Sequence, residues 1–262
     1  MFFKSTLHEL KYAFSHPYQW LLLAWYDIKQ RYRRSVLGPF WITISTAILI
    51  STLGLLWSTL FKVNIQDYLP YFAIGNILWG FMSSQINEAT TGFTQFDNII
   101  KQHRLPYPSY ILRILARNFI IMLHNTVIIF VVVFISTNGW TWTALQCIPG
   151  LVLLTLVTYF VSLICAILST RYRDLVPIVQ NFVTVAYFLS PIMWQQKTLP
   201  TQYHWIAEWN PITHLIDIVR SPLLGVSPTL INWGVSFSLL AVCAIGAYWL
   251  LDKSRNRISY WL

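Results

Sequence analysis

Arg31, Arg33 and Arg34 form a cluster of positive charge just before the first long apolar run of the sequence. The guanidinium group of arginine is a planar fork whose paired hydrogen bonds match the oxygens of a phosphate. The cluster therefore predicts a site for a phosphate-bearing molecule. The alternative is a general attraction to anionic lipid, worth about 1 kcal/mol per charge, together with a role in setting membrane topology.

Groups that would carry out catalysis are absent from the sequence. No Gly is followed by Lys, so the chain has no Walker loop for nucleotide phosphates. No group of His, Cys and carboxylate residues has the spacing of metal ligands. Cys147, Cys165 and Cys243 lie far apart in or beside apolar runs, which is typical of packing residues. We therefore expect no catalytic residue, no metal and no cofactor in this chain.

Polar and aromatic side chains recur at helical spacing in two apolar segments. The first stripe has steps of three or four residues, which place its members on one side of a helix. Its members are Phe72, Asn76, Trp79, Ser83, Asn87 and Thr90. The second stripe is Asn181, Thr184 and Phe188, with Gln180 and Tyr187 beside them. Either the two stripes line a polar path, or their small polar residues mediate packing between helices.

The composition places these residues in a membrane protein. Of the 262 residues, 56% are hydrophobic and only 10% are charged, and the mean hydropathy is +0.53. A soluble domain carries about 25% charged residues, so this chain has too few charges to cover a surface facing water. The same hydrophobicity excludes a disordered chain. In a soluble protein, the net charge of +9 would suggest a nucleic-acid partner. In a membrane protein, the positions of the Lys and Arg residues along the chain matter more than the total charge, so we expect no nucleic-acid partner.

Six segments are apolar over the roughly 20 residues that a helix needs to cross a bilayer. They are residues 39–60, 69–88, 111–136, 145–168, 176–193 and 231–251. Each is too long and too continuous for a barrel strand, so we expect an all-α membrane protein with six transmembrane helices. The chain then divides into a cytoplasmic N-terminal segment, residues 1–38, and a six-helix transmembrane domain, residues 39–262.

Lys and Arg residues set the expected orientation. With the N-terminus in the cytoplasm, fifteen of them fall on that side, and only Lys62, Lys197 and Arg220 fall on the other. Positively charged segments stay inside, so we expect both termini to be cytoplasmic. The middles of the predicted helices contain no Asp, Glu, Lys or Arg. Without carboxylates for an ion relay, the energy for uphill transport would come from a partner chain.

Two segments outside the spans are also apolar. Residues 17–35 predict an amphipathic helix that begins at Pro17 and lies in the inner headgroup layer, or that packs against the chain's own helices. Its apolar face is formed by Leu21, Ala24, Trp25, Ile28 and Tyr32. Residues 195–230 are broken by four prolines and predict short helices that re-enter the outer leaflet between the fifth and sixth spans.

The segment between the second and third spans, residues 95–110, predicts a short amphipathic helix that ends at Pro106 and Pro108. Ile99 and Ile100 are expected to dock in a groove of a partner protein. The polar and charged residues beside them are Asp97, Asn98, Lys101 and Arg104. The alternative interpretation is a plain solvated turn.

Residues 28–44 (IKQRYRRSVLGPFWITI) closely resemble the start of the first helix in the membrane subunits of type-2 ABC exporters, above all those that export polysaccharide. Residues 98–106 (NIIKQHRLP) resemble the coupling segment of that family, and residues 171–175 (RYRDL) resemble its inner loop before the fifth helix. Residues 190–192 and Asn210-Pro211 followed by Arg220 resemble its outer region. The resemblance covers nearly the whole chain, and it is more specific for the family than for the cargo.

The resemblance implies a half-transporter. Two copies of the chain would form a homodimeric channel in the bacterial cytoplasmic (inner) membrane, with two copies of an ATP-binding subunit that carries ATP and Mg. Each ATP cycle would move the coupling segment and open a path for a lipid-linked glycan, with O-antigen as the expected cargo. The two polar stripes would line that path, and Arg31, Arg33 and Arg34 would bind the diphosphate of the lipid carrier.

Three alternatives remain open from the sequence. The same class of transporter could carry capsule polysaccharide, teichoic acid, a drug, a peptide or another lipid. A secondary carrier or channel would need no ATP-binding subunit. A membrane enzyme would need a convergent acid–base or metal constellation, and the sequence contains none that we find.

Overall fold

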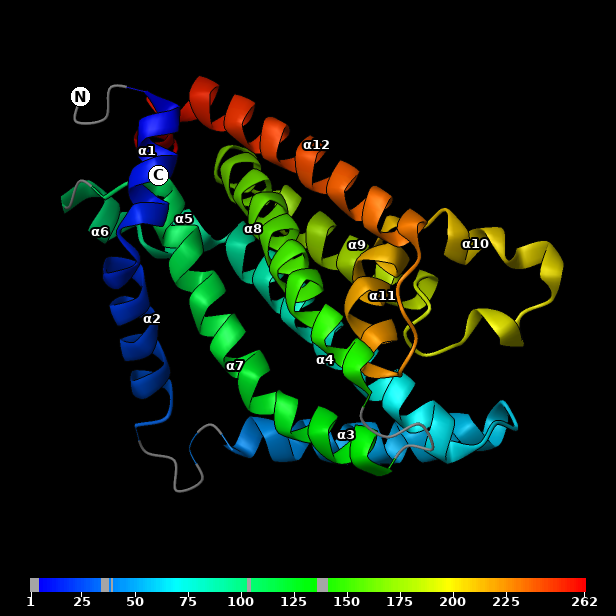
Figure 1. The fold of residues 1–262 in the computed structure, drawn as a ribbon. Coiled ribbons are helices and arrows are strands. Elements are labelled where there is room, and N and C mark those ends of the chain that lie inside the picture. Colours follow the sequence, from blue (N-terminus) through cyan, green and yellow to red (C-terminus); the bar gives the residue numbers. More distant parts are fainter. Residues whose placement is uncertain (1–4, 34–37, 39, 103–104, 136–140) are drawn as a thin grey trace.

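The computed structural model describes residues 5–33, 38, 40–102, 105–135 and 141–262. Within these ranges the protein consists of helices and connecting segments and contains no β-strand, which confirms the predicted all-α class (Figure 1). The α-helices are α1 (Thr6–Ser15), α2 (Pro17–Arg31), α3 (Phe40–Leu60), α4 (Ile65–Thr90), α5 (Gly92–Gln95), α6 (Asp97–Gln102), α7 (Tyr107–Ile135), α8 (Cys147–Arg171), α9 (Leu175–Leu189), α10 (Trp205–Glu208), α11 (Pro211–Leu223), α12 (Leu230–Ser254) and α13 (Ile258–Trp261). Short 3-10 helices are η1 (Trp142–Gln146), η2 (Gln196–Thr198) and η3 (Thr201–Tyr203).

Four of the six predicted spans correspond to helices that are long and apolar enough to cross a membrane. They are Phe40–Leu60 in α3, Tyr107–Ile135 in α7, Trp142–Arg171 in η1 and α8, and Leu230–Ser254 in α12. α4 has 26 residues, but amides such as Asn76 and Gln85 make it less apolar, and α9 has only 15 residues. Over its described residues the chain therefore has four helices of this kind, and the count of six stays a prediction.

α4 lies at the centre of the helix packing and contacts α3, α7, α8, α9 and α11. Phe72 and Ile74 of α4 are fully buried. A second close contact joins α8 and α11, because a Cβ atom at Gly150 would lie 2.5 Å from the carbonyl oxygen of Ile218. Only glycine allows the two helices to approach this closely.

α2 begins at Pro17, which is the proline that the sequence predicts for its first turn. The helix packs along α7 and buries Ala24 and Ile28, which are 0% and 4% exposed. Part of the predicted apolar face therefore packs against the chain's own helices. Leu21 and Trp25 on the same face stay 43% and 55% exposed and remain free to contact lipid.

α1 is an element that the apolar pattern does not predict, because it has only 10 residues and a mixed composition. It connects the start of α7 to the end of α12. The buried carboxylate of Glu9 accepts a 3.1 Å hydrogen bond from the backbone N–H of Tyr107. The hydroxyl of Thr6 donates a 2.5 Å hydrogen bond to the carboxylate of Asp252. α1 thus fixes two long helices relative to one another.

The C-terminal end of the chain, together with α1, α5 and α6, lies at one end of the molecule, and α10 lies away from them (Figure 1). The region between α9 and α12 consists of η2, η3, α10 and α11, which are short as its prolines predict. Pro211 occupies the first turn of α11, and the side chain of Asn210 caps that helix by accepting a hydrogen bond from the N–H of Ile212. Re-entry of these helices into the outer leaflet stays a prediction.

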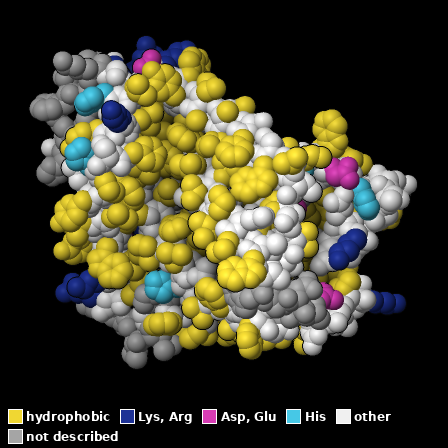
Figure 2. Space-filling view, in the orientation of Figure 1, with side chains coloured by type: hydrophobic (Ala, Val, Ile, Leu, Met, Phe, Trp, Pro, Cys, Tyr) yellow, Lys and Arg dark blue, Asp and Glu magenta, His cyan; other side chains and the backbone are white. Residues whose placement is uncertain are grey.

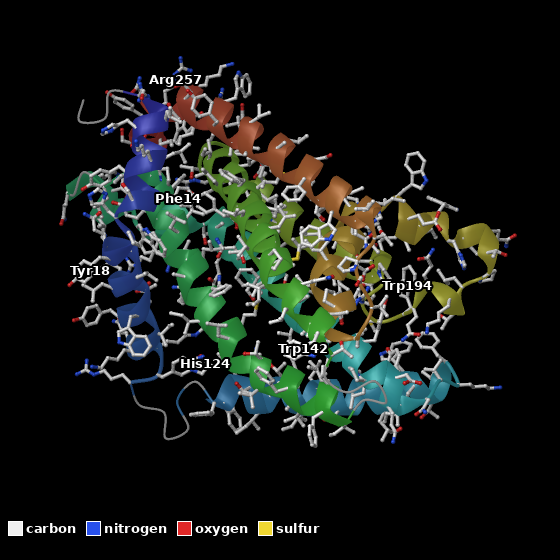
Figure 3. All side chains as sticks on the ribbon, in the orientation of Figure 1. Phe14, Tyr18, His124, Trp142, Trp194 and Arg257 are labelled. Atoms are coloured by element: carbon white, nitrogen blue, oxygen red, sulfur yellow. The ribbon has the colours of Figure 1, made fainter. Side chains whose placement is uncertain are left out.

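Apolar side chains cover much of the molecular surface (Figure 2). Tyr18 is 73% exposed and Trp142 is 89% exposed, and both side chains are labelled in Figure 3. Large exposed apolar faces are expected where lipid or another protein chain replaces water as the surroundings. The surface therefore agrees with the apolar helices in identifying a membrane protein.

Candidate functional site

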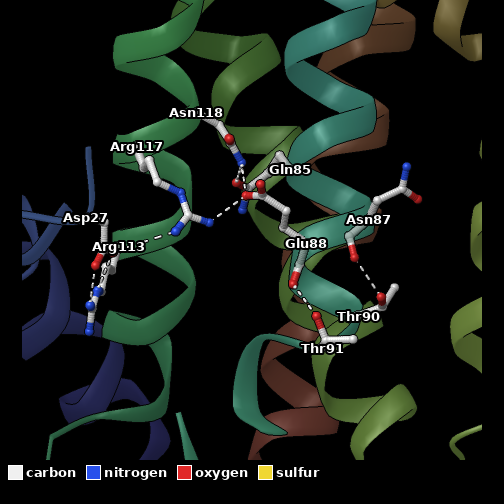
Figure 4. Close-up of polar contacts among 9 residues, drawn as sticks. All are labelled: Asp27, Gln85, Asn87, Glu88, Thr90, Thr91, Arg113, Arg117 and Asn118. Carbon is white, nitrogen blue, oxygen red and sulfur yellow. Dashed lines mark hydrogen bonds and ion pairs between the residues drawn. The ribbon is translucent and has the colours of Figure 1, made fainter. Parts of the chain in front are cut away.

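Charged and polar side chains from three helices meet in one cluster near the start of α7 (Figure 4). Its members are Asp27 of α2, Gln85 and Glu88 of α4, and Arg113, Arg117 and Asn118 of α7. We call it the α2–α4–α7 cluster. Nε and Nη2 of Arg113 donate hydrogen bonds of 2.7 and 2.6 Å to the two carboxylate oxygens of Asp27. This paired geometry is the strongest form of an arginine–carboxylate contact.

Arg117 connects the two carboxylates of the cluster. Its Nη2 donates a 2.7 Å hydrogen bond to Glu88, and its Nη1 lies 3.7 Å from Asp27. Nδ2 of Asn118 donates hydrogen bonds of 2.9 Å to Glu88 and 3.1 Å to Gln85. The cluster therefore joins α2, α4 and α7 through one continuous set of polar contacts.

Burial makes these contacts important for the position of α2. The side chains of Arg113 and Arg117 are each 11% exposed, and that of Asp27 is 15% exposed. The two arginines balance the two carboxylates, so the cluster as a whole carries no net charge. Removal of one partner from such a buried pair strands the other charge and costs about 3–5 kcal/mol.

The pairing was not predicted from the sequence, although the sequence contains a sign of it. Arg113 and Arg117 are four residues apart, which places them on one face of α7. Asp27 stands beside Ala24 and Ile28, which are the residues that α2 buries against α7. A carboxylate on a face that packs against another helix needs a cationic partner there.

The arginines predicted to bind phosphate lie where α2 ends. Arg31 is the last residue of α2 and Arg33 follows it, and both side chains are exposed. Arg34 lies outside the described residues. The structure thus leaves Arg31 and Arg33 accessible at the end of the helix that the α2–α4–α7 cluster holds.

The two polar stripes predicted on separate helices meet in the structure. The hydroxyl of Tyr187 on α9 donates a 3.0 Å hydrogen bond to Oδ1 of Asn76 on α4. The ring of Tyr187 also lies 6.0 Å from the ring of Trp79. The members of the first stripe differ in burial, however, because Phe72, Trp79 and Thr90 are only 0%, 8% and 2% exposed. These three pack within the chain.

The remaining stripe residues are more accessible. Asn76, Ser83 and Asn87 of α4 are half-buried. Asn181 and Thr184 of α9 are exposed. Phe188 follows them on α9 and is 60% exposed. α9 therefore presents amides, a hydroxyl and an aromatic ring outside the packed core.

The predicted coupling segment, residues 95–110, contains α6 and the first residues of α7. Lys101 and Asp97 form an ion pair of 2.8 Å within α6, and Asn98 is exposed. Ile99 and Ile100 are half-buried and pack partly against the core of the same chain. Arg104 lies outside the described residues.

The coupling segment also contacts the α2–α4–α7 cluster. Phe96, the residue before α6, is buried, and the guanidinium carbon of Arg113 lies 4.5 Å from the centre of its ring. A cation over an aromatic face is an attractive contact. α6 is thereby connected to the residue that anchors Asp27 of α2.

A second buried ion pair lies in the region between α9 and α12. Arg220 is 2% exposed, and its Nη2 lies 2.5 Å from a carboxylate oxygen of Asp217. Its Nη1 donates a 2.7 Å hydrogen bond to the carbonyl oxygen of Pro191, and its guanidinium group lies 3.8 Å from the centre of the Tyr71 ring. This contact joins α11 and α4 to the segment that follows α9.

No group of three or more His, Cys, Asp or Glu residues in the described ranges could hold a metal ion.

Comparison with known proteins gives a consistent family. Residues 18–224 match the model of the ABC-2 type transporter family. The O-antigen export system permease protein RfbA of Klebsiella pneumoniae is 23% identical over 194 residues, which cover 72% of this chain and 74% of that protein. The polysialic acid transport protein KpsM of Escherichia coli is 23% identical over 219 residues, which cover 82% and 84%.

The family match covers α2 from its second residue, the α2–α4–α7 cluster, the coupling segment, both polar stripes and the buried Arg220. This confirms the resemblance read from the sequence motifs. The chain belongs to the ABC-2 type transporter family and is a transporter membrane subunit rather than an enzyme.

Proposed function

We propose that this chain is the channel-forming membrane subunit of an ATP-driven exporter that moves a lipid-linked polysaccharide, with O-antigen as the cargo. The names of the relatives support this proposal, since one is an O-antigen export permease and the other a polysialic acid transport protein. The working unit is two copies of this chain with two ATP-binding subunits, which bind ATP and Mg²⁺. It resides in the bacterial cytoplasmic membrane with both termini in the cytoplasm.

The observation that carries the proposal is the exposed polar and aromatic side of α9. Asn181, Thr184 and Phe188 lie there, next to the hydrogen bond between Tyr187 and Asn76. None of these residues is charged. A sugar presents hydroxyl groups at its rim and C–H groups on its faces, so amides and aromatic planes bind it without holding it too strongly. In the homodimer, α9 of each copy faces the path of the glycan.

The cytoplasmic part of the mechanism follows from the contacts of the coupling segment. The ATP-binding subunit docks on α6 through the exposed parts of Ile99 and Ile100. The polar and charged residues Asp97, Asn98, Lys101 and Arg104 surround that contact. Movement of α6 passes through Phe96 and Arg113 to Asp27 and so displaces α2. Arg31, Arg33 and Arg34 at the end of α2 bind the diphosphate of the lipid carrier.

Capsule polysaccharide is the second candidate cargo, because one relative is named for polysialic acid transport. Deletion of the gene in its own host, followed by detection of surface glycans, tests both cargoes. The proposal predicts loss of surface O-antigen and accumulation of lipid-linked O-antigen inside the cytoplasmic membrane, both reversed by the plasmid-borne chain. Loss of capsule with unchanged O-antigen would instead support the second candidate.

A further inference from the structure

A cavity of about 380 Å³ lined by both polar and apolar groups lies between α3, α4 and α7, and its lining includes Asn76, which also contacts Tyr187 of α9. Each helix presents one face to it. The lining residues of α7 are Asn118, Ile121, Met122 and Asn125, at helical spacing. α4 contributes Asn76, Gly80, Ser84 and Glu88 among others, and α3 contributes Ile42 and Thr46. Three neighbouring helices thus place amides and hydroxyls around one space.

One end of the cavity contains a buried polar atom without a hydrogen-bond partner in the described part of the chain. Asn125 is 9% exposed, and its Oδ1 has no hydrogen-bond partner among the described residues. Asn118 lies seven residues earlier on α7, about 10 Å along the helix, and belongs to the α2–α4–α7 cluster. A buried amide oxygen without a partner is unfavourable unless a bound molecule donates to it. Asn125 therefore calls for a ligand with a hydroxyl or N–H group.

The other end of the cavity is positively charged. Arg31 and Glu88 line this cavity and also a neighbouring one of about 400 Å³. Glu88 is neutralised by Arg117, whereas the side chain of Arg31 has no ion pair or hydrogen bond within the described part of the chain. The uncompensated charge at this end is therefore the guanidinium group of Arg31, which suits a phosphate.

The surroundings identify the source of the ligand as the membrane. α3, which forms one wall, is an apolar helix whose outer side is exposed, with Ile48 and Leu55 each 61% exposed. Acyl or prenyl chains can lie along that side while a polar headgroup enters between the helices. We propose that this cavity binds the phosphate-bearing, hydroxyl-rich headgroup of a membrane lipid, with the phosphate at Arg31 and a hydroxyl group at Asn125.

Two lipids share this chemistry: an anionic glycerophospholipid with a glycerol headgroup, and a prenyl phosphate that carries a sugar. The second source rests on the proposed function, and the first does not. Choline headgroups lack a hydrogen-bond donor for Asn125 and carry a positive charge, so phosphatidylcholine is the matched negative lipid. The experiment below distinguishes the two sources.

The test measures the thermal unfolding midpoint of the full chain in neutral detergent. The midpoint is followed as the concentration of one added lipid increases. The three lipids are a short-chain phosphatidylglycerol, a short-chain phosphatidylcholine and a short prenyl-diphosphate sugar. Asn125→Leu removes the amide at nearly constant volume. Gly80→Leu fills the cavity, since a Cβ atom at Gly80 meets nothing within 4 Å. Arg31→Gln removes the exposed charge. Thr126→Val is the control, because Thr126 is next to Asn125 but lines a different, apolar cavity.

We expect phosphatidylglycerol or the prenyl-linked sugar to raise the midpoint of the parent chain and of Thr126→Val. The rise should be absent in Asn125→Leu and Gly80→Leu and reduced in Arg31→Gln. The more effective lipid identifies the source. An equal rise in all variants, an equal effect of phosphatidylcholine, or no rise with either lipid would overturn the proposal.

If the two buried substitutions lower the lipid-free midpoint, Arg31→Gln decides, because its side chain is exposed. Failure here would remove Arg31 from binding of the lipid carrier, whereas export of glycan, which is the proposed function, is measured separately.

Discussion

The hydroxyl of Tyr187 on α9 donates a 3.0 Å hydrogen bond to the side-chain oxygen of Asn76 on α4. The same tyrosine ring lies 6.0 Å from the ring of Trp79. Two stripes that are about 100 residues apart in the sequence therefore contact one another, although part of the α4 stripe is buried within the chain. The polar groups of α4 reach the exposed side of α9 through this contact.

Replacement of Phe188 by Ala tests whether that surface contacts the cargo. Phe188 is 60% exposed, so its removal costs little packing within the chain. An aromatic contact of about 1 kcal/mol corresponds to about a fivefold change in binding. We expect Phe188→Ala to lower export several-fold, measured as surface glycan per unit of membrane-inserted chain. Phe134→Ala on α7, where the ring is 79% exposed, is the control and should leave export unchanged. Normal export by Phe188→Ala would remove α9 from the path.

The pair of Asp27 and Arg113 is expected to hold α2 in place. Asp27→Ala and Arg113→Ala should each lower stability by about 3–5 kcal/mol, because each leaves a buried charge without its partner. The double variant should lose less than the sum of the two. Thermal unfolding in detergent measures all three. The control is Asp97→Ala, since the side chains of Lys101 and Asp97 are 49% and 32% exposed. Such a surface pair contributes about 0.2–1 kcal/mol. Strictly additive losses at Asp27 and Arg113 would contradict the role of the cluster.

The expected membrane orientation predicts opposite accessibility for two exposed lysines. Lys101 of α6 is expected in the cytoplasm, and Lys197 of η2 is expected on the outer side. Each is changed to Cys in a chain whose three native cysteines are replaced by Ser. A membrane-impermeant maleimide added to intact spheroplasts should label Lys197→Cys and not Lys101→Cys, and permeabilisation should make both reactive. Labelling of Lys101→Cys before permeabilisation would reverse the orientation.

Glu9 gives stability a defined dependence on pH. Burial raises the pKa of its carboxyl group above the ordinary value of 4.5, against the opposing effects of the Tyr107 N–H and of Arg255. The folded protein therefore holds a proton on Glu9 at pH values where the unfolded chain has lost it. Stability contributed by this group is present below pH 4.5 and falls as the pH rises through the window between the two pKa values.

Glu9→Gln should remove that dependence, because the amide oxygen can still accept from the Tyr107 N–H while the buried charge is absent. We expect its unfolding midpoint to match that of the parent chain at pH 4 and to exceed it at pH 8. Glu208→Gln is the control, because Glu208 is exposed. Its unfolding midpoints at pH 4 and at pH 8 should both equal those of the parent chain. A lower midpoint for Glu9→Gln at pH 8 would show that the ionised carboxylate stabilises the fold.

The apolar runs predict the long helices well because burial in lipid requires continuous apolar sequence. The start of α2 at Pro17 and the short helices after α9 also follow from local chemistry, since proline fixes where a helix can begin or end. α1 escapes prediction because its stability comes from tertiary contacts such as Glu9 with Tyr107, which no local pattern contains.

The sequence likewise predicts some features of the candidate site and not others. Helical spacing identifies the two stripes, but it does not distinguish Phe72, which is fully buried, from Asn76, which contacts α9. The pairing of Asp27 with Arg113 joins residues 86 positions apart and depends on how α2 packs against α7. Long-range pairs of this kind are set by the packing of whole helices, so a single sequence does not specify them.

The central claim is that this membrane subunit moves its cargo only with energy from a separate ATP-binding chain. Proteoliposomes that contain this chain alone, or this chain with its co-purified ATP-binding subunit, test it directly when loaded with lipid-linked glycan. We predict ATP hydrolysis and glycan transfer across the bilayer only in the second preparation and only with ATP and Mg²⁺. Nucleotide hydrolysis by the chain alone, or glycan transfer driven by an ion gradient in its liposomes, would contradict the account.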